Sequence, residues 1–167
     1  MTGRGKDAPF RYREAIAALT PQLRGFARFL ARDATRADDL VQETLLRALE
    51  HEASWQDGTD LRAWLFRILR NAFLDQARRS GTERRALGAL DADAAQPATQ
   101  PGIAELGELG RAIAALPAAQ REAILLVAAL EFTVAEAAAV TGLPEGTLKA
   151  RVSRARDALA RQLGPRR

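Results

Sequence analysis

The apolar residues of segment 145–163 recur at the spacing of one helix face. On a helical wheel they fall within one narrow sector: Leu148, Val152, Ala155, Leu159 and Leu163. The opposite side holds small residues beside charges, namely Ala150, Ser153, Arg154, Asp157 and Arg161. Basic residues stand on both flanks, with Lys149 and Arg156 on one and Arg151 on the other. The pattern predicts a helix that packs through one face and presents a charged face outward.

The residues before this helix carry start and stop signals for two more helices. An apolar-rich helix is predicted over residues 118–131, directly after a proline. A second helix begins at Thr133 with a capping box that Glu136 completes. Gly142 suits a left-handed C-cap, and Pro144 can open the basic helix. Two short helices around a glycine turn, the second basic, indicate a helix-turn-helix, although helical hairpins without a DNA role share this turn chemistry.

A further amphipathic helix is predicted over residues 37–50. Its apolar stripe consists of Val41, Leu45, Ala48 and Leu49. The other side carries Asp39, Glu43, Leu46, Arg47 and Glu50. A leucine among outward charges is a mild sign of an interface, although single exposed leucines are common.

A turn-rich loop at residues 54–60 leads into the next predicted helix, which Thr59 or Asp60 can cap. The apolar side of that helix holds Leu61, Trp64, Leu65, Ile68, Leu69 and Ala72. Its other side holds Arg67, Arg70, Asn71 and Arg78. An Arg–Asn stripe beside a loop with an aromatic ring suits nucleic acid, because unstacked bases pack on aromatics and hydrogen-bond through their edges. Trp55 could equally close the loop as a core residue, and composition alone favours that interpretation.

No stretch alternates apolar and polar residues as a strand does, and the helix formers Ala, Leu, Arg and Glu dominate the chain. Residues 86–107 contain Pro97, Pro101 and glycines without a sustained period, which predicts a linker. We therefore predict an all-α protein with two small helical domains, residues 10–85 and 108–164, joined by a flexible acidic linker.

Composition narrows the chemistry that the chain can perform. The 167 residues include no cysteine and a single histidine, His51, and a lone histidine is usually a surface or packing residue. No nucleophile–base pair, metal cluster or glycine-rich phosphate loop is visible, so we expect no catalytic site, metal or cofactor. The longest apolar run, residues 123–130, is too short to cross a bilayer, and no signal peptide is visible. The expectation is a soluble, cytoplasmic protein.

Charge is distributed unevenly along the chain. The net charge is only +4, but residues 86–110 carry four carboxylates and no Lys or Arg. Residues 145–167, in contrast, carry seven basic and two acidic side chains. Such a segment could simply solvate a helix. Clustered on one face of a packed helix, however, it is the electrostatic footprint of a phosphate-binding surface.

Four motifs occur in order along the chain: DDLVQETLLRALE, W-x-x-G-T-x-L-x-A-W-L-F-R-I-L-R-N, LP-x-x-Q-R-E-A-I-L-L-V and E-G-T-L-K-A-R-V-S-R-A-R. In this order and spacing the chain resembles a bacterial extracytoplasmic-function (group 4) RNA polymerase sigma factor over residues 15–80 and 108–163. The segments GTDLRAWLFRILRN and REAILLVAALEFTVAEAAAV are most similar to the general-stress-response subgroup of alphaproteobacteria.

The resemblance implies how residues divide among partners. Binding of the polymerase clamp is implied for Asp39, Gln42, Glu43, Leu46 and Arg47. Capture of a flipped base and reading of the −10 promoter element are implied for Trp55, Gln56, Asp57, Gly58, Thr59, Arg67 and Asn71. Reading of the −35 major groove is implied for Lys149, Ala150, Arg151, Ser153 and Arg154.

The same resemblance implies a protein that directs promoter-specific transcription initiation in a stress response, under the control of an anti-sigma factor. Its partners would be promoter DNA and core RNA polymerase, at the β′ clamp and the β flap, with the polymerase supplying the chemistry. No membrane insertion is expected, and the free protein would be a monomer. Two alternatives stay open: a sigma-like decoy that sequesters an anti-sigma factor, and a helix-turn-helix DNA-binding regulator.

Two positions depart from the family pattern. Ala150 stands where serine is frequent, so a contact there is predicted to be apolar, for instance with a thymine methyl group. Glu131 stands where glycine is common before the helix-turn-helix, which predicts a changed loop but an intact motif.

Overall fold

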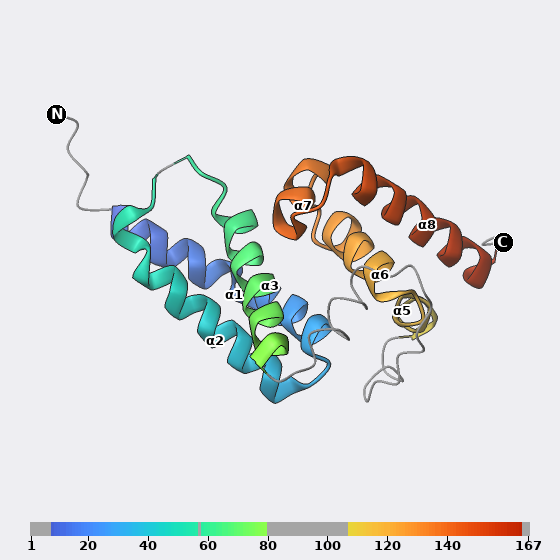
Figure 1. Cartoon of the computed structure of the whole chain (residues 1–167), viewed down its shortest axis with the longest axis horizontal. Coiled ribbons are helices and arrows are strands. Elements are labelled where there is room, and N and C mark those ends of the chain that lie inside the picture. Colours follow the sequence, from blue (N-terminus) through green and yellow to red (C-terminus); the bar gives the residue numbers. More distant parts are fainter. Residues whose placement is uncertain (1–7, 57, 80–106, 165–167) are drawn as a thin grey trace. The chain divides into compact units, whose positions relative to one another are not determined.

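The computed structural model describes residues 8–56, 58–79 and 107–164 (Figure 1). The chain falls into two compact units, Met1–Gln76 and Ala77–Arg167, each of which is described by itself. Every regular element in the described residues is helical, which confirms the predicted all-α fold. Asp57 and nearly all of the predicted linker, residues 86–107, lie outside the described residues.

The first unit is built on two antiparallel helices, α1 (Ala8–Ala31) and α2 (Ala34–Glu50), which lie side by side (Figure 1). A short 3-10 helix, η1 (Glu52–Ser54), follows α2 directly. A loop then leads into α3 (Leu61–Arg79).

Side-chain caps set the starts of α2 and α3. The Asp33 carboxylate accepts a hydrogen bond from the Arg36 amide at 2.8 Å. The Asp60 carboxylate accepts one from the Ala63 amide at 3.0 Å. Of the two caps predicted for α3, the structure therefore shows Asp60, whereas the hydroxyl of Thr59 donates within the loop to the carbonyl of Gln56.

Apolar side chains from all three helices form the core of the first unit. The rings of Phe26 in α1 and Phe66 in α3 pack with their centroids 5.3 Å apart. The fully buried positions include Leu23, Ala27, Leu40, Val41, Ala48, Leu65, Leu69 and Ala72. Their burial fixes the direction in which the remaining faces of α2 and α3 point.

Two sequence predictions about these faces were wrong. Leu49, assigned to the core stripe of α2, is 43% exposed, and Thr44 is buried in the stripe instead. Burial of Thr44 is tolerated because its hydroxyl donates to the Leu40 carbonyl at 2.7 Å. Arg70, assigned to the outer side of α3, is only 7% exposed, because it lies four residues after the buried Phe66 and so shares its side of the helix.

The second unit contains α5 (Gly107–Ala114), α6 (Ala118–Ile124), the π-helical turn η3 (Leu125–Ala129), α7 (Val134–Thr141) and α8 (Glu145–Leu163). The long helix α8 packs against α5, α6 and α7. The buried apolar side chains of this unit include Leu116, Leu126, Val140, Leu148 and Ala155, which are all nearly inaccessible.

The predicted helix-turn-helix is present, with the predicted turn chemistry. The Thr133 hydroxyl accepts from the Glu136 amide at 3.1 Å, and the Glu136 carboxylate accepts from the Thr133 amide at 2.7 Å. Gly142 ends α7 in the left-handed conformation, with φ of 72°, and α8 begins directly after Pro144. These caps confirm the boundaries of α7 and the start of α8.

The helix predicted over residues 118–131 changes character in its second half. The amide of Leu130 donates to the carbonyl of Leu125, five residues back, which defines a π turn. Glu131 follows with φ of 57°, in the left-handed region that favours glycine. The backbone therefore explains why glycine suits this position, and the helix-turn-helix beyond it is intact despite the glutamate.

Candidate nucleic-acid and partner interfaces

The outward face of α8 presents most of the side chains that the sequence singles out for DNA. Lys149, Ser153 and Arg154 are exposed, and Ala150 is half-buried between them. The buried side consists of Leu148, Val152 and Ala155. Because an α-helix fits the major groove, this face can bring a guanidinium, a hydroxyl and a methyl group to base edges.

Arg151 does not occupy the exposed flank that the helical wheel predicted. Only 8% of this residue is exposed. The reason is its spacing: it lies three residues after Leu148 and four before Ala155, so it adjoins two buried side chains on the same side of α8. A buried Arg151 is placed to support the helix rather than to contact a phosphate.

The other flank of α8 agrees with the prediction. Lys149 and Arg156 line one groove of about 260 Å³ beside the helix. Val127 and Val134 contribute apolar side chains to this groove, and Asp157 adds a carboxylate. Two cations on one flank of the outward face suit contacts with the phosphates along one side of a DNA groove.

The loop between α2 and α3 forms a pocket of about 250 Å³. Its lining consists of His51, Ser54, Trp55, Gln56, Thr59 and Trp64. The Trp55 ring lies 5.5 Å from the Trp64 ring and 5.6 Å from the Tyr12 ring, while the residue stays partly exposed. Trp55 thus packs in an aromatic cluster and also lines the pocket, while its contact with a base remains a prediction.

The chemistry of this pocket suits a small flat ring. Indole side chains offer stacking surfaces, and the nearby hydroxyl and amide groups can hydrogen-bond to a ring edge. Gly58 turns the loop with φ of 92°, a conformation that other residues adopt only under strain. An unstacked nucleobase has the shape and the polar edge that such a pocket accommodates.

Two polar residues of α3 extend the pocket into a stripe. Arg67 and Asn71 are exposed and lie four residues apart, so they share one side of the helix. Trp64 of the pocket precedes Arg67 by three residues and therefore adjoins the same side. The structure therefore gathers the predicted −10 residues 55, 56 and 59 in the pocket, with the stripe adjoining it through Trp64, and Gly58 lies in the same loop.

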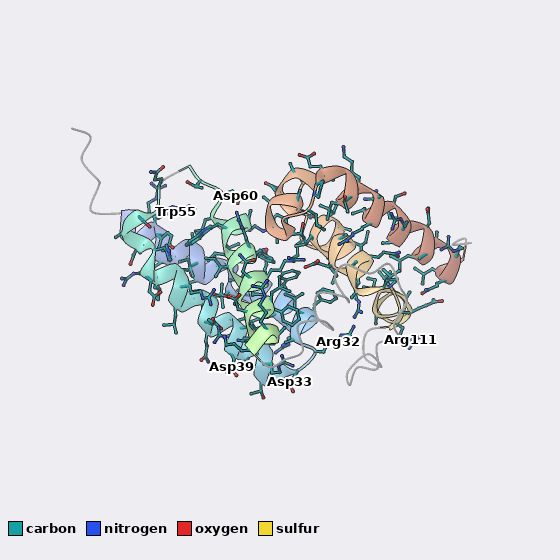
Figure 2. All side chains as sticks on the ribbon, viewed as in Figure 1. Arg32, Asp33, Asp39, Trp55, Asp60 and Arg111 are labelled. Atoms are coloured by element: carbon teal, nitrogen blue, oxygen red, sulfur yellow. The ribbon has the colours of Figure 1, made fainter. Side chains whose placement is uncertain are left out.

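The outward side of α2 carries the residues predicted to contact a protein. Asp39 and Gln42 are exposed, and Leu46 is 63% exposed, a large value for an apolar residue. Figure 2 shows Asp39 toward the end of α2 near the α1–α2 turn, and Trp55 at the opposite end of that helix. Asp39 therefore lies far from the pocket along α2, whereas Leu46 is only five residues before His51 of the pocket, so this candidate surface extends along the helix toward the loop.

Glu43 and Arg47 on the same helix are already engaged within the protein. The Arg47 guanidinium donates to Glu43 Oε1 at 2.6 Å and lies 3.6 Å from Asp75 Oδ2. The Gln76 amide donates to Glu43 Oε2 at 3.0 Å. This network ties α2 to α3, so a change at Glu43 affects more than an outer surface.

Sequence reasoning missed the contribution of α1 to the loop. The Tyr12 hydroxyl donates to the Ala48 carbonyl at 2.6 Å, and the Arg13 guanidinium donates to both carboxylate oxygens of Glu52. The hydrogen bond from Arg13 holds the pKa of Glu52 below its usual value, and burial together with Glu52 raises the pKa of Tyr12. The paired residues are separated by 36 and 39 positions in the sequence, so no local sequence pattern predicts these contacts.

The described residues contain no group of three or more His, Cys, Asp or Glu side chains that could hold a metal ion. In the same part of the chain, no helix is both long and apolar enough to span a bilayer.

Comparison with known proteins assigns both units. Residues 15–83 match the family Sigma-70 region 2, and residues 106–159 match Sigma-70, region 4. The chain is 47% identical over 154 residues to the ECF RNA polymerase sigma factor EcfG of Rhodopseudomonas palustris, an alignment that covers 89% of this chain and 82% of that protein.

Two solved structures are similar over most of the chain. The sigma factor RpoE of Bartonella quintana, in complex with the anti-sigma factor NepR, has a TM-score of 0.72 and 38% identity, and the match covers 94% of this chain and 99% of that one. CnrH, in complex with the cytosolic domain of CnrY, has a TM-score of 0.61 and 27% identity, with 91% and 86% covered. With two sigma-region domains and close relatives over nearly its whole length, the chain belongs to the extracytoplasmic-function family of RNA polymerase sigma factors.

Proposed function

We propose that this sigma factor divides promoter recognition between its two units. The first unit binds the β′ clamp of core RNA polymerase through Asp39, Gln42 and Leu46 on α2, and takes a melted base of the −10 element into the loop pocket. The second unit contacts the β flap and places α8 in the −35 major groove. The polymerase supplies the chemistry, and the two proteins work together in the cytoplasm.

The aromatic pocket is the observation that carries this proposal. Two indole rings 5.5 Å apart, an exposed Arg67 and an exposed Asn71 form one continuous surface on a protein with a basic helix-turn-helix elsewhere. A DNA-binding regulator of the simple helix-turn-helix type has no need of a stacking pocket in a second unit. A protein that opens DNA does, because a melted strand exposes bases that can stack on aromatic rings.

Regulation by an anti-sigma factor is the second part of the proposal. It is supported by the similarity to RpoE and CnrH, whose structures contain NepR and the cytosolic domain of CnrY. The similarity to EcfG and RpoE favours a role in a stress response. The free protein is expected to be a monomer, with the anti-sigma factor covering surfaces that the polymerase otherwise binds.

In-vitro transcription tests these assignments. Core polymerase with the wild-type chain, acting on a library of genomic fragments, should produce transcripts whose start sites share two upstream motifs. Arg154→Ala should relax base preference at one or two −35 positions, because a bidentate Arg–guanine pair contributes about 1–3 kcal/mol of discrimination. Arg161→Ala, also exposed on α8 but two turns further along, is the matched control and should retain the wild-type motif.

The same assay separates the alternatives. If the wild-type chain binds an anti-sigma factor yet yields no promoter-specific transcripts, the protein is a decoy. If Arg154→Ala leaves every −35 position unchanged, α8 does not read sequence through that residue. Trp55→Ala should weaken selection at the −10 motif while the −35 motif persists, since the two contacts lie on separate units.

A further inference from the structure

Three contacts from α1 converge on the segment that carries the pocket. The Tyr12 ring packs 5.6 Å from the Trp55 ring, and the Tyr12 hydroxyl donates to the last turns of α2 at Ala48. Arg13 grips Glu52 with two nitrogens, Nε to Oε1 at 2.9 Å and Nη2 to Oε2 at 2.8 Å. All three targets lie within eight positions of one another, just before or inside the pocket loop.

The segment between them has little stability of its own. The 3-10 helix η1 is only three residues long, and such helices have poor hydrogen-bond geometry. Trp55 is its C-cap residue, so the direction of the indole follows the direction of η1. A two-nitrogen grip on Glu52 restrains orientation as well as distance, because the fork of the guanidinium matches the plane of the carboxylate.

We propose that Arg13 and Tyr12 are positioning residues for the pocket: they hold η1 against α1 and thereby set the angle of Trp55 relative to Trp64 for nucleobase stacking. Neither residue lines the pocket, so they act through Glu52 and Trp55. The inference rests on the proposed role of the pocket in −10 recognition and adds a part of α1 to the recognition machinery.

The exposure of the ion pair makes this role separable from folding. The Arg13 side chain is 66% exposed and that of Glu52 17% exposed. Ion pairs in such positions add little to global stability. Breaking the pair should therefore leave the fold intact while loosening the wall of the pocket, a combination that a purely structural residue would not produce.

The tryptophans of the protein provide a fluorescence probe of the pocket. The chain contains two tryptophans, Trp55 and Trp64, and both line the pocket, so the tryptophan fluorescence of the free protein, excited selectively over that of Tyr12, arises there alone. Acrylamide quenching of that fluorescence measures how tightly the indoles are held. Capture of a randomised single-stranded DNA pool by the reconstituted holoenzyme measures the consequence for base binding.

Charge reversal and a charge swap test the proposal. Arg13→Glu should raise acrylamide quenching and weaken capture of single-stranded DNA about two- to five-fold, the range expected from loss of one exposed ion pair. Helix content and the thermal midpoint should stay at their wild-type values. The double variant Arg13→Glu with Glu52→Arg should restore both quenching and capture. Arg11→Glu, the same charge change on an exposed neighbour, is the control and should behave as wild type.

The outcomes are distinct. Wild-type capture and quenching in Arg13→Glu would overturn the positioning role and leave the pocket assignment standing. Failure of the swap to restore binding, or loss of helix content in Arg13→Glu, would also overturn it, because the effect would then come from folding. A wild-type holoenzyme that captures no single-stranded DNA would overturn the pocket assignment, and with it this inference.

Discussion

For Arg151, the sequence and the structure predict different roles: the sequence predicts an exposed contact with DNA, and the structure shows a buried side chain. The helical wheel placed Arg151 on an exposed flank of the basic helix, a position suited to a phosphate contact. Loss of such a contact would lower the slope of log binding affinity against log salt concentration by about one unit. The structure buries Arg151 to 8% exposure on a helix that packs against α5, α6 and α7. We therefore expect Arg151→Ala to change stability and to leave the salt dependence of the folded protein unchanged.

The size of the effect follows from what is buried. Truncation removes two methylene groups beyond Cβ, which at about 0.8 kcal/mol each contribute about 1.6 kcal/mol. Buried polar groups that lose a hydrogen-bond partner add about 1–3 kcal/mol. A total of about 3–5 kcal/mol should lower the melting temperature of this unit by more than about 10 °C, since a small domain loses about 4–8 °C per kcal/mol.

Thermal unfolding of the full chain, followed by circular dichroism, measures this change. Arg154→Ala is the matched control, because removing an exposed side chain from the same helix should alter stability by less than about 0.5 kcal/mol. Arg151→Met restores the apolar stem without the charge and should recover about half of the loss. DNA binding across a salt series at low temperature completes the test. An unchanged melting temperature together with a reduced salt slope in Arg151→Ala would refute the burial argument.

Three further predictions concern other elements. Glu131→Gly should stabilise the protein by about 0.5–1 kcal/mol in thermal unfolding, with unchanged transcription, because it relieves a left-handed residue at φ of 57°. Acidification should loosen the pocket: the lowered pKa of Glu52 means that its pairing is complete above the ordinary value of 4.5 and is lost as the pH falls below it. Tryptophan quenching should rise over that range in the wild type, whereas Glu52→Gln should show raised quenching at neutral pH as well. Leu46→Ala should weaken binding to core polymerase in a titration, while its melting temperature should stay within a few degrees of the wild-type value. Glu43→Lys should lower both the polymerase affinity and the melting temperature, because Glu43 accepts a hydrogen bond from Gln76 of α3.

Local signals in the sequence proved sufficient for α2, α3, α7 and α8 and for several of their caps, but no predicted helix corresponded to α1 or α5. The capping box at Thr133, the glycine turn at Gly142 and the Asp60 cap each depend on residues within three or four positions, and each is present in the structure. Fold class also followed from local periodicity, since no strand pattern competes with the helical one. The assignments of residues to DNA and polymerase remain predictions.

Two of the errors share one physical cause, a buried helix face wider than the helical wheel assumed. A helical wheel assumes a single buried face, but α8 packs against three helices and so also buries Arg151. Arg70 was misplaced because the buried face of α3 is wide enough to include Phe66 and Arg70 as well as Leu65 and Leu69. The ion pair between Arg13 and Glu52 was not predicted, because it depends on how α1 packs against η1. Residues close together in the sequence carry no information about that packing.

The position of α2 suggests why both proposed contacts of the first unit depend on one helix. Its 17 residues span about 25 Å at 1.5 Å per residue, with Asp39 near its start and the pocket loop directly after its end. Tyr12 holds it to α1 at Ala48, and Gln76 holds it to α3 at Glu43. Because α2 is a continuous helix held at both points, the orientation of its outward surface determines the orientation of the pocket loop that follows it. If the polymerase docks on its outward side, the place of the stacking pocket relative to the polymerase is then fixed by helix geometry. On this argument, a substitution that tilts α2 from its buried side, touching neither surface, should impair polymerase binding and −10 selection together.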